Sequence, residues 1–127
     1  MKSTELNSLL SPSSDGVKIK MAIQNALPEF RRGLSENGRS ALIDLQDEGN
    51  NFVITKYELL NLCNWYLTDV IDEVELEYLA SAIELSEDFE YDVRIGEEIF
   101  LLATPEINHP ISKDLIRQMV VRLQKAA

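Results

Sequence analysis

The stretch from Asp72 to Asp88 constrains the fold most, because its apolar residues fall into two helical stripes rather than one. Leu76, Leu79, Ala80 and Ile83 form the first stripe, Val74, Tyr78, Ala82 and Leu85 form the second, and Glu73, Glu77, Ser81, Glu84 and Asp88 line a narrow polar strip between them. A helix needs two apolar stripes only where it packs between neighbours. We therefore expect a doubly packed helix, opened by the capping-box spacing of Asp72 and Glu75.

Further helices are indicated by residues suited to cap them. Thr55 and Glu58 have the spacing of a capping box, Asp92 precedes an apolar-periodic stretch that runs through Leu102, and Ser112 precedes the last such stretch. In the stretch after Asp92, the residues expected to point inward are Ile95, Ile99, Leu102 and Ala103, and those expected to point outward are Glu97 and Glu98. The second half of the chain thus predicts four helices.

The first half of the chain is less regular. Residues 1–16 are rich in serine and predict a flexible arm or short helix, followed by a loop. Residues 17–27 predict a helix that stops near Pro28, although the alternation at their start leaves a strand possible. Residues 40–46 predict another short helix, and residues 50–54 a connector or brief extended piece.

These patterns predict an all-α protein, either a helical bundle or an irregular array of five to seven helices. A chain of 127 residues is long enough to bury one core without disulfides or metals, so residues 1–127 are expected to form a single helical domain. The acidic part should be folded as well, because hydrophobic residues make up 45% of the chain.

The charge of the chain is segregated. The thirty residues from Asp69 to Glu98 contain twelve carboxylates and one base, Arg94, whereas the remaining residues contain ten acids and eleven bases. The net charge of -10 therefore comes from one quarter of the sequence. Charge concentrated in this way attracts cationic partners over long range, whereas scattered acids would only keep a protein soluble.

Catalytic and metal-binding patterns are absent from the sequence. The lone Cys63 and the lone His109 are far apart in the chain, and Cys63 falls on the apolar face of its helix, as a small buried side chain would. No glycine-rich phosphate loop is present, and the run from Ser86 to Asp92 lacks the glycine and terminal glutamate of an EF-hand. We therefore expect no enzyme, no cofactor and no metal site.

The partner is expected to be a basic protein. A single cysteine and a first segment without a signal peptide's apolar run favour the cytoplasm, and no apolar run approaches the length that spans a bilayer. Membranes and nucleic acids are both anionic, so neither is expected as a partner. The basic residues Arg31, Arg32 and Arg39 are too few, and lack interleaved aromatics, to reverse this expectation.

The predicted interface combines the polar strip of the central helix with the loop after it. Its members are Glu73, Glu77, Glu84, Glu87, Asp88, Glu90 and Asp92. Three aromatic residues, Tyr78, Phe89 and Tyr91, lie among these acids and would either anchor a partner or close the core. Asp92 also has a structural role as a helix cap.

The segment from Asp72 to Ser112, DEVELEYLASAIELSEDFEYDVRIGEEIFLLATPEINHPIS, resembles the small acidic immunity proteins that accompany bacterial toxins, especially those of contact-dependent growth inhibition systems. The resemblance rests on the character of the segment, so no functional residue is carried over from it. It implies a cytosolic protein that binds its cognate toxin domain, often a nuclease, and covers the toxin's active site or substrate-binding surface.

Two other classes of function remain open. One is a non-enzymatic helical adaptor or regulatory protein that binds another basic protein partner. The other is a carboxylate-dependent hydrolase, which would need a divalent metal.

Overall fold

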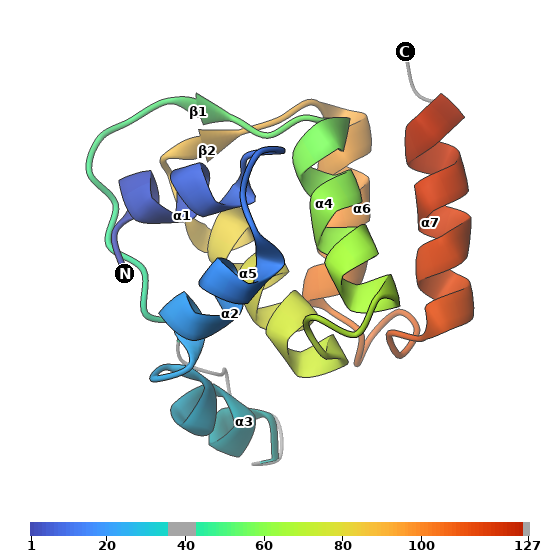
Figure 1. The fold of residues 1–127 in the computed structure, drawn as a ribbon, viewed down its shortest axis with the longest axis horizontal. Coiled ribbons are helices and arrows are strands. Elements are labelled where there is room, and N and C mark those ends of the chain that lie inside the picture. Colours follow the sequence, from blue (N-terminus) through green and yellow to red (C-terminus); the bar gives the residue numbers. More distant parts are fainter. Residues whose placement is uncertain (36–42, 126–127) are drawn as a thin grey trace.

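The computed structural model describes residues 1–35 and 43–125. In these ranges the chain forms α1 (Ser3–Leu10), α2 (Gly16–Ile23), α3 (Leu27–Ser35), β1 (Phe52–Val53), α4 (Lys56–Leu67), α5 (Glu73–Leu85), β2 (Phe89–Glu90), α6 (Val93–Ala103) and α7 (Lys113–Lys125). Figure 1 shows α4, α6 and α7 on one side of the molecule, α1, α2 and α3 on the other, and α5 between them. The predicted all-α array is confirmed, with the addition of two very short strands.

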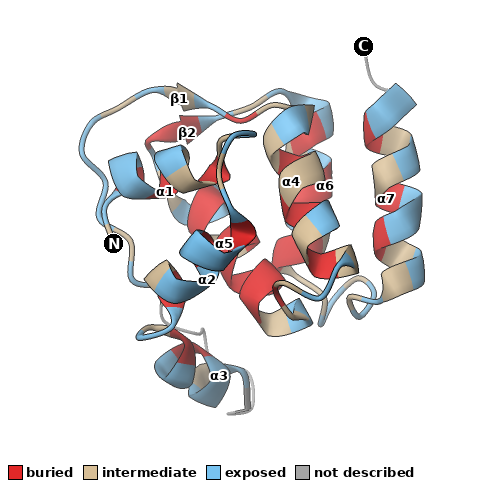
Figure 2. Ribbon diagram, in the orientation of Figure 1, coloured by how far each residue is buried: buried red, intermediate tan, exposed pale blue. Residues whose placement is uncertain are grey.

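Helix α5 is the central, doubly packed helix that its two apolar stripes predict. It packs along α6 and also contacts α3 and α4. Most of its length is buried, as Figure 2 shows, and both stripes contribute to the core, Leu76, Leu79 and Ile83 from one and Tyr78 and Ala82 from the other. Figure 2 also shows that the outer helices bury only one side each, so α5 organises the core.

The predicted caps are present. The backbone N–H of Glu75 donates to Asp72 Oδ1 and the backbone N–H of Asp72 donates to Glu75 Oε1, both at 2.8 Å, which completes a capping box. Thr55 and Glu58 form the same kind of capping box at the start of α4. Asp92 caps α6 and Ser112 accepts a hydrogen bond from the first turn of α7. All four helices of the second half therefore begin where the sequence predicts.

The first half of the chain differs from the prediction at two places. The helix expected to stop near Pro28 ends at Ile23, and Pro28 lies instead in the first turn of α3, where a backbone N–H would have no helical partner in any case. The described part of the predicted helix 40–46 is not helical, because Gln46 forms a parallel bridge with Lys2. Residues 40–42 of that prediction lie outside the described residues.

Residues 1–16 form a short helix and a loop rather than a flexible arm. Helix α1 contacts α2 and α4, and its Leu6 and Leu10 are fully buried. The bridge to Gln46 precedes it, with the N–H of Ser3 donating to the carbonyl of Gln46 at 2.9 Å. The first helix is therefore fixed to the core from both its apolar face and its start.

A two-stranded parallel sheet joins the loop before α4 to the loop before α6. Phe52 pairs with Phe89 and Val53 pairs with Glu90. The N–H of Phe52 donates to the carbonyl of Asp88 at 2.8 Å, and the N–H of Ile54 donates to the carbonyl of Glu90 at 2.9 Å. The extended piece predicted at residues 50–54 is thus confirmed, and its pairing draws the acidic segment 86–92 against residues 46–54.

Candidate partner-binding surface

The structure divides the seven predicted interface carboxylates into exposed and buried groups. The exposed ones are Glu73, Glu84, Glu87, Glu90 and Asp92. The buried ones are Glu77 and Asp88, at 8% and 2% exposure. The prediction of one continuous surface strip is therefore wrong for these two residues.

Asp88 is a structural residue. Its carboxylate accepts hydrogen bonds from Ser3 Oγ at 2.5 Å and from the backbone N–H groups of Glu48 and Gly49 at 2.6 and 3.1 Å. The bond from Ser3, followed by the bond from Glu48, holds the pKa of Asp88 below its ordinary value. The helical projection misplaced this residue because α5 ends at Leu85, so Asp88 does not continue the helical strip.

Glu77 is buried on α5 and forms no ion pair with a described residue. Burial, and after it the nearby charge of Glu106, raises the pKa of its carboxyl to about 7. The polar strip of α5 is covered at this point, since Glu106 belongs to the connection between α6 and α7. Glu77 is therefore a buried acid of the core rather than a contact for a partner.

Glu73 lies apart from the other exposed acids. Eleven residues of helix separate it from Glu84, a rise of about 16 Å. The charge of Glu73 acts on Tyr66, at the end of α4, together with the charges of Lys113 and Asp69. Lys113 Nζ lies 2.7 Å from Asp69 Oδ1, so this end of α5 already holds a cation.

At the other end of α5, carboxylates from two distant segments come together. Asp47 accepts hydrogen bonds from Ser86 Oγ at 2.5 Å and from the backbone N–H of Glu87 at 3.1 Å. Glu48 accepts from the hydroxyl and the backbone N–H of Thr4, which lowers its pKa. We call this surface the acidic rim and define it as Asp47, Glu48, Glu84, Glu87 and Glu90, all of which are exposed.

The acidic rim is electrostatically unbalanced. Within residues 1–35 and 43–125, no ion pair joins any of its five carboxylates to a cation. Lys2 lies close enough to lower the pKa of Glu48, after the larger effect of the hydrogen bonds from Thr4. Asp47 and Glu48 lie outside the acidic segment from Asp69 to Glu98, and only their contacts with residues 86–88 bring them to the rim.

Asp92 and the three aromatic residues have structural positions. Asp92 Oδ1 accepts from the N–H of Ile95 at 2.8 Å, as the predicted cap. Tyr78 and Phe89 are buried in the core, where Tyr78 meets Phe30 edge to face at 5.1 Å between ring centroids. Tyr91 is half-buried beside Gly96. Only Tyr91 therefore contributes surface near the rim.

The other groups singled out by the sequence lie away from the acidic rim. Cys63 is fully buried with its sulfur 3.8 Å from that of Met119, and burial raises the pKa of its thiol to about 12. His109 is exposed in the connection before α7. In the part of the chain that the structure describes, no three His, Cys, Asp or Glu side chains are grouped as metal ligands, and no helix has the length and apolar character to cross a bilayer.

No family model, curated protein or solved structure matches the chain.

Proposed function

We propose that this protein is a non-enzymatic, cytoplasmic immunity protein that binds and neutralises a cognate toxin domain through the acidic rim. The observation that carries the proposal is the contact between two segments some forty residues apart, 47–48 and 84–90, which together present five exposed carboxylates without an ion pair to a described cation. The resemblance of residues 72–112 supplies the class of partner.

The physical chemistry of the rim suits a basic partner. Unpaired like charges repel one another in the free protein, and a cationic surface relieves that repulsion on binding. A complementary field also accelerates association, up to about 10⁸ to 10⁹ M⁻¹s⁻¹ at low salt, which favours rapid capture of a toxin. Nuclease toxins hold phosphates in basic clefts, so an acidic inhibitor can occupy the field that a nucleic acid would otherwise occupy.

The test is titration of the protein with the product of the reading frame directly upstream, the usual position expected of a cognate toxin. The double variant Glu84→Lys/Glu87→Lys reverses two exposed charges of the rim, and it should weaken binding at low salt by about 100-fold or more. Glu29→Lys is the matched control, because Glu29 is exposed on α3, at the opposite end of the molecule from β1 and β2 in Figure 1.

Unchanged affinity of the double variant at low salt would overturn the assignment of the rim. Growth of cells that co-express both proteins supplies the second readout. Protection by the wild type, and its loss in the double variant, supports neutralisation. Binding without protection would instead favour a helical adaptor for a basic protein.

A further inference from the structure

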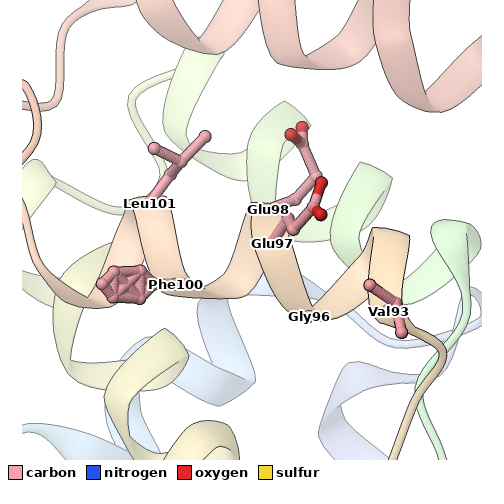
Figure 3. A pocket seen from close by; sticks show the side chains of 6 residues that line it. All are labelled: Val93, Gly96, Glu97, Glu98, Phe100 and Leu101. Atoms are coloured by element: carbon pink, nitrogen blue, oxygen red, sulfur yellow. The ribbon is translucent and has the colours of Figure 1, made fainter.

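The exposed face of α6 carries an apolar hollow. It has a volume of about 520 Å³ and is lined by Val93, Gly96, Glu97, Glu98, Phe100 and Leu101. Figure 3 shows Val93 and Phe100 toward the two ends of the hollow, with Gly96 between them. Val93 is 80% exposed and Phe100 is 38% exposed, so the hollow presents apolar side chains to solvent.

The hollow follows from the spacing of α6. Val93, Gly96 and Phe100 are separated by three and four residues and therefore share one helix face. Gly96 has no side chain to fill the space between the other two. A Cβ atom at this position would lie 3.1 Å from the ring of Tyr91, so the packing of Tyr91 favours glycine here.

Two acids line the hollow, and they differ in their pairing. Glu98 is neutralised by Arg122, whose Nε and Nη2 donate to its two carboxylate oxygens at 3.2 and 3.0 Å, whereas Glu97 is exposed and forms no ion pair with a described residue. Both carboxylates had been expected to point outward, and the burial of Glu98 against α7 corrects that expectation. The ring of Tyr91 lies beside Gly96 of the hollow, and the charge of Glu84, a residue of the rim, acts on Tyr91.

We propose that this hollow receives an apolar side chain from a cationic segment of the partner, while the basic residues of that segment meet Glu97 and the acidic rim. The inference rests on the proposed function and adds its anchor point. Apolar pockets ringed by polar groups are where binding energy concentrates in protein interfaces. A second copy of this chain is a poor occupant, because two molecules of charge -10 would meet acid against acid.

Two synthetic peptides of equal length and charge test the proposal. Both are lysine-rich, and one has a central phenylalanine where the other has serine. The phenylalanine peptide should bind the wild-type protein about tenfold more tightly, the effect of burying one apolar side chain worth ~1.4 kcal/mol. In nuclear magnetic resonance titrations it should shift the amide signals of Val93, Gly96 and Glu97, whereas the serine peptide should shift mainly the rim.

Val93→Ser is the test variant, because Val93 is exposed at the first position of α6 and its replacement leaves the core intact. The tenfold preference for phenylalanine should fall below about threefold in this variant. Val17→Ser is the matched control. Val17 is likewise an exposed valine in the first turn of an aspartate-capped helix, and its replacement should leave the preference unchanged.

Each outcome separates the two proposals. Equal affinity of both peptides, with shifts confined to the rim, would overturn the hollow as an anchor and leave the proposed function standing. A preference for phenylalanine that survives Val93→Ser would also overturn it. Self-association of the wild type, abolished by Val93→Ser in sedimentation equilibrium, would replace the proposed occupant with a second copy. If neither peptide binds at low salt, the anchor is wrong and the proposed function depends on the toxin titration alone.

Discussion

At the scale of the residue, two of the buried glutamates, Glu77 and Glu98, have opposite surroundings. Glu98 receives two hydrogen bonds from Arg122, so its charge is neutralised where α6 meets α7. Glu77 forms no ion pair with a described residue, and burial, followed by the charge of Glu106, raises its pKa to about 7. Because the ordinary pKa of a glutamate, as in the unfolded chain, is 4.5, the folded protein holds this proton more tightly than the unfolded chain does.

The sign of the resulting pH dependence is fixed by this raised pKa. The stability contributed by protonated Glu77 is fully present below pH 4.5 and is lost as the pH rises through 7. Glu77→Gln keeps the neutral shape at every pH. The variant should therefore be more stable than the wild type at pH 8, by on the order of 1 kcal/mol once screening by solvent is included, and should lose this advantage near pH 5.

Urea unfolding at both pH values measures this difference. Glu97→Gln is the control, because Glu97 is exposed on α6 and has no described ion pair to lose. A difference between Glu77→Gln and the wild type that is the same at pH 5 and pH 8 would show that Glu77 does not titrate in this range.

At the scale of the element, the sequence predicted the structural features that depend on residues close together in the chain. The boxes at Thr55 and Asp72 join residues three apart, so the starts of α4 and α5 could be predicted directly. The parallel pairing of Phe52 with Phe89, and of Lys2 with Gln46, depends on residues far apart in the chain. No local periodicity reports such contacts, which explains why residues 43–46 were wrongly predicted to be helical.

The packing of α2 on α4 gives a prediction at the same scale. At Gly16, the first residue of α2, an added Cβ atom would lie 2.7 Å from Cγ and Cδ1 of Trp65. Helix propensity alone would make Gly16→Ala stabilising by up to about 1 kcal/mol. These two ring atoms are close to the backbone of Trp65, so the ring cannot easily move away from the added Cβ atom. The steric overlap should therefore outweigh the gain in helix propensity and destabilise the protein by about 1 to 3 kcal/mol.

Thermal unfolding of four proteins checks the sign: wild type, Gly16→Ala, Trp65→Ala and the double variant. The penalty of Gly16→Ala should disappear in the Trp65→Ala background, because the ring is then absent. A melting temperature of Gly16→Ala above that of the wild type would contradict this prediction. It would show that the gain in helix propensity exceeds the steric cost and that the Trp65 ring moves away easily.

At the scale of the whole molecule, the acidic segment of the sequence contributes to a local acidic surface. The residues that form this surface differ from those that the sequence predicted. Glu84, Glu87 and Glu90 were predicted and remain exposed at one end of α5. Asp47 and Glu48 join them through hydrogen bonds that span forty residues of sequence, which no charge count could reveal. Glu77 and Asp88 leave the interface because tertiary packing covers them.

In the proposed function, the acidic rim binds a basic partner. This binding is tested most directly by measuring the association rate by stopped flow as a function of salt concentration. With the upstream toxin domain as partner, the rate for the wild type should fall by at least tenfold between low and physiological salt. The rate for Glu84→Lys/Glu87→Lys should be slower at low salt and depend less on salt. An association rate that is independent of salt, and equal in the two proteins, would contradict the account.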